Sequence, residues 1–133
     1  MADTVTSQTI QDGEKTAILK FTNESDGTGE ASVKKVDVSA LASNSAGKAC
    51  SSVSISRIYW AWRGMGVDIE FDATTNVLAI PLPADSTGDE YYDLFTGIPN
   101  NAGSGVTGDI DFTTVGHSNG DAYSIILVLT KNF

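Results

Sequence analysis

An alternation of apolar and polar residues with a period of two recurs along the chain and predicts β-strands. The clearest case is the segment 67–72, in which Val67, Ile69 and Phe71 alternate with three acidic residues. Other segments show the same alternation or a run of β-branched and aromatic residues, and together they predict about nine short strands. We place these strands at residues 5–10, 16–21, 33–38, 53–62, 67–71, 77–82, 91–95, 108–114 and 122–130.

Turn residues separate the predicted strands. Asn119-Gly120 tolerates the positive φ of a tight hairpin, so we expect it to join the strands 108–114 and 122–130. The segment 72–76 predicts a second turn, between 67–71 and 77–82. Pro81 and Pro83 have no amide donor, which places their strand at a sheet edge or ends it there.

The pattern as a whole predicts an all-β fold. We expect a single-domain antiparallel β-sandwich over residues 1–133, jelly-roll or immunoglobulin-like, with residues 1–11 as an extended N-terminal arm. The strand 122–130 is apolar on both faces, which predicts a central position or one between packed sheets. The face parity changes between Ile55 and Ile58, which predicts a β-bulge near Ser56-Arg57, and residues 38–42 favour one helical turn.

The charge is uneven along the chain. Residues 1–63 hold seven acids and seven bases, whereas residues 64–133 hold ten acids and one base and therefore carry the whole net charge of −9. A surface that binds phosphates needs clustered cations, so we expect neither nucleic acid nor an anionic membrane as a partner of that half. The acidic half is interpreted as a solvated face that keeps an abundant protein soluble, or as a match for a basic partner.

Candidate catalytic and metal-binding residues are few. His117 is the only histidine and Cys50 the only cysteine, and no nucleophile-elbow motif accompanies either. Catalytic zinc with its usual ligands would need more histidine or cysteine than the chain contains. We therefore expect no enzyme, and we assign no catalytic, cofactor-binding or metal-binding residue.

Three acidic groupings could in principle bind a hard cation. They lie in the segment 23–27, at Asp85 with Asp89-Glu90, and at Asp109 with Asp111, and none matches a calcium-loop motif. Alternation places Asp109 and Asp111 on an outward strand face, so we expect solvated carboxylates there. Paired carboxylates also hydrolyse glycosides, but no clear aromatic platform for a sugar flanks these.

One short segment concentrates residue types that are common in protein interfaces. Tyr59, Trp60, Trp62 and Arg63 lie within five residues of one another, and Phe133 ends the chain with an aromatic ring. Tryptophan, tyrosine and arginine dominate interface hot spots, which makes these five residues candidates for partner contact. The alternative is that the two tryptophans, which share one strand face, fill the core of the sandwich.

Several stretches along nearly the whole chain carry a resemblance to a known group of proteins. They are residues 1–13, 20–23 (Lys-Phe-Thr-Asn), 26–31 (Asp-Gly-Thr-Gly-Glu-Ala), 35–41, 97–103 (Gly-Ile-Pro-Asn-Asn-Ala-Gly) and 108–114 (Gly-Asp-Ile-Asp-Phe-Thr-Thr). Together they resemble small virion structural proteins of tailed bacteriophages, a group that includes head decoration, or cement, proteins. These motifs are scaffold and turn residues, so the resemblance assigns no binding residue.

The resemblance implies a β-rich protein, commonly trimeric, that is made in the host cytoplasm and sits on the outer capsid surface of the virion without a cofactor. Its partners would be the major capsid protein or other virion proteins. The polar character of the segment 1–11 is itself compatible with pairing to a neighbouring subunit by β-augmentation, which uses main-chain hydrogen bonds. Two alternatives remain open. One is a tail, neck or fibre-attachment component; the other is a carbohydrate-binding β-sandwich, with Trp60 or Trp62 exposed beside Asp68 or Glu70.

Overall fold

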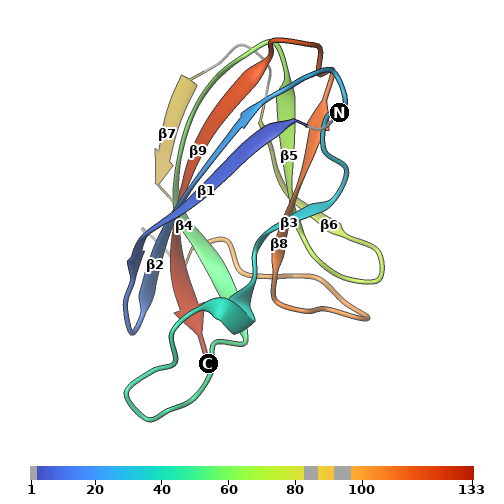
Figure 1. Ribbon diagram of the computed structural model, residues 1–133. Helices are drawn as coiled ribbons and strands as arrows, with labels where there is room; N and C mark the ends of the chain where they lie inside the picture. Colours follow the sequence, from blue (N-terminus) through green and yellow to red (C-terminus); the bar gives the residue numbers. More distant parts are fainter. Residues whose placement is uncertain (1–2, 83–86, 92–96) are drawn as a thin grey trace.

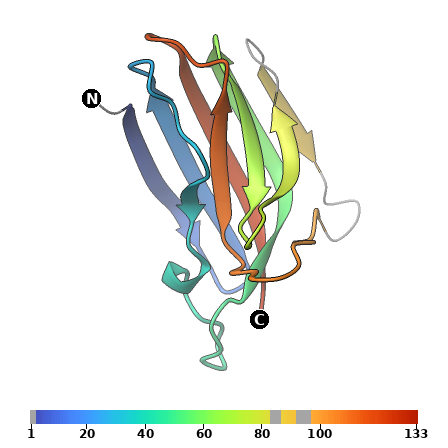
Figure 2. The same ribbon diagram turned by 90° about the vertical axis from the view of Figure 1, so that its right-hand side faces the viewer.

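The chain forms two antiparallel sheets that pack face to face (Figure 1, Figure 2). The computed structural model describes residues 3–82, 87–91 and 97–133. The five-stranded sheet has the order β1 (Thr4–Asp12), β2 (Thr16–Glu24), β9 (Ala122–Asn132), β4 (Ser52–Arg63) and β7 (Thr87–Tyr91). The four-stranded sheet has the order β3 (Val33–Val36), β8 (Ile110–Val115), β5 (Gly66–Phe71) and β6 (Val77–Leu82). The predicted β-sandwich is therefore confirmed.

The strand order is that of a jelly roll. Strand β2 pairs with β9, β3 with β8, β4 with β7 and β5 with β6, so the pairs are nested along the chain. Nested antiparallel pairs shared between two sheets are the arrangement of the eight-stranded jelly roll, and β1 adds a ninth strand beside β2. The immunoglobulin order, in which the third, sixth and seventh strands form one sheet, is not the order seen here.

The core lies between the two sheets and is built from alternate positions of each strand. Buried apolar residues of both sheets form one cluster, and its aromatic rings meet edge to face. The ring centroids of Phe21 and Phe112 are 5.4 Å apart, and those of Phe112 and Tyr123 are 5.9 Å apart. These contacts join β2 and β9 of the larger sheet to β8 of the smaller one, so the period-two pattern does specify which faces meet.

Several local predictions are confirmed. The register of β4 against β9 shifts between Ile55 and Arg57, which is the predicted bulge. Strand β9 is the central strand of the five-stranded sheet, and β6, with Pro81, is an edge strand. The predicted helical turn is a 3₁₀ turn over Val38–Ala40. No helix in the described part of the chain is long and apolar enough to cross a bilayer.

Two predictions about connections were wrong. Residues 118–121 do form a turn, with Gly120 at φ +91°, but β8 and β9 belong to different sheets, so this turn crosses between layers instead of closing a hairpin. A turn signal reports a chain reversal and does not reveal whether the flanking strands pair. The strand predicted at 91–95 is instead β7, over Thr87–Tyr91, and residues 92–95 lie outside the described residues.

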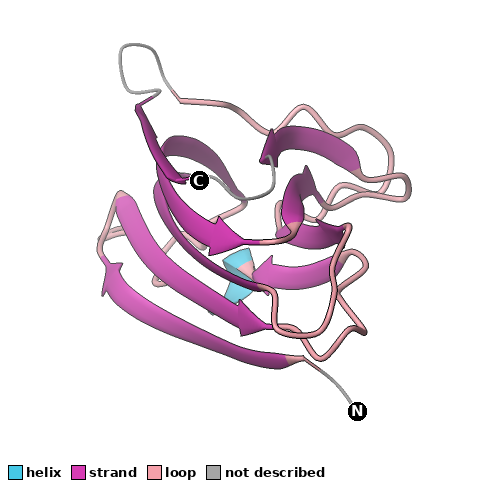
Figure 3. Cartoon of the chain, turned by 90° about the horizontal axis from the view of Figure 1, so that it is seen from above, coloured by secondary structure: helices cyan, strands magenta, loops and turns pink. Residues whose placement is uncertain are grey.

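The N-terminal segment, expected as an extended arm, contains strand β1 from Thr4 onward. β1 pairs with β2 of the same chain along its length, with one register shift between Thr9 and Gln11. The larger sheet consequently extends one strand beyond the smaller sheet on this side of the molecule (Figure 3).

Candidate functional site

The outer face of the five-stranded sheet combines apolar side chains with two cations. On β2, β9 and β4 these residues alternate with buried core positions, so they point away from the smaller sheet. They lie in two adjacent rows of the sheet register, and all of them are partly exposed. We name this surface the β9 face; it comprises Ile18, Lys20, Arg57, Tyr59, Ile126 and Val128.

An arginine and a tyrosine are stacked on the β9 face. The guanidinium carbon of Arg57 lies 4.2 Å from the centroid of the Tyr59 ring, which is a cation–π contact. Lys20 lies opposite Ile126 in the register of β2 and β9. Lys20 and Arg57 thus bring two positive charges to this face, although the chain as a whole carries −9.

The outer face of the four-stranded sheet is different in kind. In register, Lys34, Asp111, Glu70 and Leu78 form one row across β3, β8, β5 and β6. The next row contains Thr113 and Asp68. The hydroxyl of Thr113 donates a 2.7 Å hydrogen bond to Oε1 of Glu70. We name this surface the acidic face; it comprises Lys34, Asp68, Glu70, Leu78, Asp111 and Thr113.

The expectation that Asp109 and Asp111 are solvated was wrong. Their exposed fractions are 4% and 3%. Oδ1 of Asp109 accepts a 2.9 Å hydrogen bond from the backbone N–H of Val38, and its Oδ2 lies 2.9 Å from Nζ of Lys34. Oδ2 of Asp111 accepts a 2.9 Å bond from the amide of Asn76. Residues that are distant in sequence thus cover both carboxyl groups.

One carboxylate oxygen of Asp111, Oδ1, is buried without a compensating hydrogen bond in the described part of the chain. Burial first, and the nearby Asp72 carboxylate second, raise the pKa of Asp111 from 3.8 to about 6. The burial of the Asp111 carboxyl group therefore carries an electrostatic cost. No group of three or more histidine, cysteine, aspartate or glutamate side chains among the described residues is arranged to hold a metal ion.

A buried polar network ties the loop after β2 to the sandwich. Oε1 of Glu30 accepts hydrogen bonds from the amide of Asn23 at 2.9 Å and from the hydroxyl of Tyr123 at 2.6 Å. Its other oxygen forms an ion pair with Lys35, whose side chain is also buried. Burial, together with the Glu30 charge, raises the pKa of Tyr123. Every charge in this group has a partner, which is the usual condition for a buried charge that stabilises the fold.

His117 lies beside this network. Its Nδ1 is 3.1 Å from the hydroxyl oxygen of Thr114, which is buried and accepts a 2.8 Å bond from the backbone N–H of Glu30. A Cβ atom at Gly29, which has φ +75°, would lie 2.3 Å from the imidazole ring, so only glycine leaves room for it. His117 is thus partly buried in a packed loop, and its hydroxyl neighbour is already engaged with the backbone.

The interface residues predicted from sequence are separated by the fold. Tyr59 lies on the β9 face, whereas Trp60 lies on the opposite side of β4 and packs against the core. Phe133 also packs against the core and is partly exposed. The side chains of Trp62 and Arg63 lie outside the described part of the structure.

The rest of the β9 face was not identified from sequence as a site. The sequence did contain a sign of this face, because Ile126 and Val128 make strand 122–130 apolar on both sides.

Cys50 is buried next to the beginning of β4. Its Sγ lies 3.1 Å from the backbone oxygen of Ser52. Burial raises the pKa of the thiol, which lowers the fraction of reactive thiolate near neutral pH. This environment is that of an unreactive cysteine.

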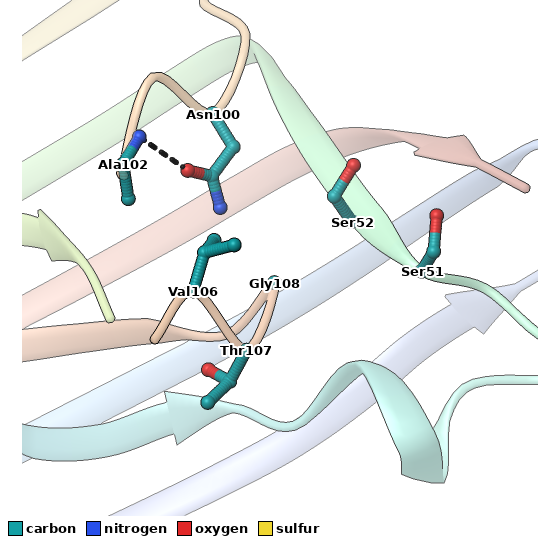
Figure 4. A pocket seen from close by; sticks show the side chains of 7 residues that line it. All are labelled: Ser51, Ser52, Asn100, Ala102, Val106, Thr107 and Gly108. Carbon is teal, nitrogen blue, oxygen red and sulfur yellow. Dashed lines mark hydrogen bonds between the residues drawn. The ribbon is translucent and has the colours of Figure 1, made fainter. Parts of the chain in front are cut away.

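A pocket of about 240 Å³ lies between the beginning of β4 and the loop before β8 (Figure 4). Oδ1 of Asn100 accepts a 2.9 Å bond from the N–H of Ala102, and its buried Nδ2 points into the pocket without a partner in the described structure. The hydroxyls of Ser51 and Thr107 donate to Asn132 and Asp72. Hydroxyl, amide and apolar groups line this pocket, and no charged side chain is among its described lining residues.

The constellation expected for a carbohydrate-binding module is not formed by Trp60. The Trp60 indole lies on the inner face of the larger sheet and packs against the core. It also lies close to Gly88 of β7, where an added Cβ atom would be 2.2 Å from the ring. Asp68 and Glu70 lie on the outer side of the other sheet. The aromatic ring and the two acids are therefore on different layers of the sandwich.

A comparison of the sequence with protein-family models and with curated proteins finds no match. The functional assignment therefore depends on the geometry described above and on the resemblance drawn from the sequence.

Proposed function

We propose that this protein is a non-enzymatic structural protein of a virion, and specifically a head decoration protein that binds the outer capsid lattice of a tailed bacteriophage. The observation that carries the proposal is the β9 face. Three branched apolar side chains, Ile18, Ile126 and Val128, stand on the outer side of the central strands, where no second sheet in the described part of the chain covers them. An antiparallel sheet that faces only water normally places polar residues there.

The energetic argument favours a protein partner for this face. Removing apolar surface from water is worth about 25 cal/mol per Å², and a contiguous apolar patch on an otherwise polar protein commonly marks an interaction site. Lys20 and the stacked Arg57 add positive charge to this face. Such charges fix the orientation of a partner and exclude wrong partners more than they increase the affinity. The partner surface that fits is apolar with acidic groups.

The fold and the sequence resemblance point the same way. Jelly rolls are frequent in viral capsid and lectin domains, although a fold by itself does not assign a function. The motifs that resemble small virion proteins span nearly the whole chain. On this proposal the β9 face contacts the capsid, and the acidic face points to solvent, where its charge repels other particles.

Decoration would stabilise the shell through mass action. A protein that binds across assembled subunits, and not to free ones, shifts the equilibrium toward the assembled lattice. This needs no cofactor and no covalent bond. Self-association of the decoration protein would strengthen the effect, because several weak contacts on one lattice act together.

The test compares phage heads that carry this protein with heads that lack it. We expect decorated heads to survive heating and low salt better, and we expect immunogold label over the whole head surface. Equal survival would contradict the decoration role. Label confined to the tail or neck would assign the protein to that alternative structural role.

A further inference from the structure

Strand β1 has the least covered side chains of any strand described in full. Residues 4–11 are all exposed, although all of them except Ile10 pair with β2. The inward-facing positions Val5, Ser7 and Thr9 lie opposite buried positions of β2, but they are themselves exposed. In the described part of the chain, β1 has a neighbouring strand on one side only.

Carboxylate anchors hold β1 in place at both ends. Before the strand, Asp3 accepts hydrogen bonds from the amide of Asn23 at 3.1 Å and from the backbone N–H of Gly29 at 3.2 Å. At its end, Asp12 forms an ion pair with Lys131, whose side chain is fully buried. Oδ2 of Asp12 also accepts a 2.9 Å bond from the N–H of Ala42. β1 is therefore a fixed edge and not a fraying terminus, which means that its free backbone groups are preorganised for pairing.

The other three edges carry features that discourage strand addition. β6 contains Pro81 and a register shift, and β3 has only four residues, two of which are lysines. β7 has five residues, including Asp89 and Glu90 in its sequence. Proline, charge and short length are the devices by which proteins block edge-to-edge pairing. β1 has nine residues, no proline and no charged residue before Asp12.

A groove continues from this edge toward β3. It has a volume of about 230 Å³ and is lined by Val5, Thr6, Ser7, Phe21, Val33, Lys34 and Lys35. Val5 and Val33 are 46% and 38% exposed. An added strand at the edge of β1 would bring more side chains over this opening, so pairing would bury apolar surface in addition to forming backbone hydrogen bonds.

We propose that β1 pairs with β1 of a second copy of this chain, antiparallel and across a two-fold axis, so that two five-stranded sheets become continuous. Charge permits this occupant. Each copy carries −9, but residues 4–11 are uncharged, so two β1 strands can pair without placing like charges opposite one another. The side chains also suit one another, because cross-strand pairs of hydroxyl residues are favourable, and Thr6 already forms such a pair with Thr22 of β2.

A two-fold axis has a geometric consequence that a mixed interface lacks. In antiparallel pairing of identical strands, one residue lies directly opposite its own counterpart, and its neighbours pair symmetrically around it. A single cysteine at that residue would form a disulfide between copies. The native Cys50 is buried and is replaced by serine in this test, so that it adds no background.

The first experiment measures molar mass by analytical ultracentrifugation for the wild type, Ser7→Lys and Ser124→Lys. Ser7 is central in β1, whereas Ser124 is on the outer side of central strand β9, so the second lysine adds the same charge away from the edge. We expect a wild-type dimer, a dissociation constant raised at least about tenfold by Ser7→Lys, and little change for Ser124→Lys. Circular dichroism confirms that each variant is folded.

The second experiment places single cysteines at residues 4 to 9, one per variant, in the Cys50→Ser chain. We expect disulfide formation to peak at one position and to fall on either side. A monomeric wild type, a trimer of the kind that the phage resemblance implies, or cross-linking that is uniform over the strand would overturn the proposal. Because no phage component is present, these results are independent of the proposed decoration role.

Discussion

The two outer faces of the sandwich are made by the same alternation of side chains, yet they present opposite chemistry. On the β9 face, isoleucine, valine and tyrosine are partly exposed beside two cations. On the acidic face, carboxyl groups dominate, and Asp111 is almost fully buried among polar neighbours. The acidic face also exposes one apolar side chain, Leu78, but the β9 face groups several of them in adjacent rows, which is why we propose that this side of the molecule meets a partner.

The jelly-roll topology explains how one chain makes both faces. The electrically neutral half of the sequence supplies β2 and β4 to the larger sheet, and the acidic half supplies β5, β6 and β8 to the smaller sheet. Three strands depart from this division: β3 of the neutral half lies in the smaller sheet, and β7 and β9 of the acidic half lie in the larger sheet, with β9 at its centre. Between Ala122 and Thr130, strand β9 carries no charged residue, so it adds no acidic group to the larger sheet.

The largest expected effect on stability comes from comparing acidic substitutions on the inner and outer sides of β9. Leu127 is fully buried, so Leu127→Asp places an unpaired charge in the core and should prevent folding. Ile126→Asp, at the next position but on the outer side, should cost only about 1 kcal/mol of unfolding free energy. Thermal melts followed by circular dichroism measure both. A folded Leu127→Asp variant, or an unfolded Ile126→Asp variant, would contradict the assignment of faces.

Removal of the cation from the acidic face should have the next largest effect. Lys34→Met leaves the buried carboxylate of Asp109 without its ion-pair partner, so the variant should unfold at a lower urea concentration than the wild type. Lys48→Met removes an exposed lysine and serves as the matched control, with an expected change below about 0.5 kcal/mol. Urea unfolding of both variants gives the comparison, and equal stabilities would show that Asp109 does not need Lys34.

The pKa of Asp111 predicts a pH dependence of stability. Because burial raises this pKa from 3.8 to about 6, the folded state favours the protonated carboxyl group. The stabilisation is complete below the ordinary pKa and is lost as the pH rises through about 6. Asp111→Asn removes this loss, so it should be about 1 kcal/mol more stable than the wild type at pH 7, an advantage that should diminish toward pH 4. A difference that does not vary with pH would contradict the raised pKa.

The smallest expected effect concerns the cations of the β9 face. Lys20→Ala and Arg57→Ala should each weaken partner binding a few-fold, by about 1 kcal/mol or less, and mainly through the association rate. The effect should diminish at high salt. Lys48→Ala is the control for a general change in charge. Surface plasmon resonance at two salt concentrations measures the rates, and identical losses for all three variants would remove any special role of the β9 face cations.

The sequence pattern predicted the layers of this fold well, because burial acts on alternate residues of each strand. The bulge between Ile55 and Arg57 and the edge position of β6 followed from local rules on parity and proline. The turn at Asn119-Gly120 was recognised, but its partner strands were not, because a local turn signal carries no information about which sheet receives the chain.

The candidate site was less predictable for the same physical reason. The burial of Asp109 depends on Lys34, and that of Asp111 depends on Asn76, and neither neighbour is close in sequence. Conversely, the two apolar sides of β9 were visible in the sequence, but either a central position or a second covering sheet explains such a strand. Only the arrangement of the sheets shows that one of those sides faces outward.

The most direct test of the central claim compares one apolar-to-acidic change on each outer face. Ile126→Asp alters the β9 face, and Leu78→Asp alters the acidic face at a residue that is 49% exposed. Binding of each folded variant to phage heads that lack the protein is measured by co-sedimentation. We predict that Ile126→Asp no longer binds and that Leu78→Asp binds like the wild type. Wild-type binding by Ile126→Asp, or a loss of binding with Leu78→Asp, would contradict the account.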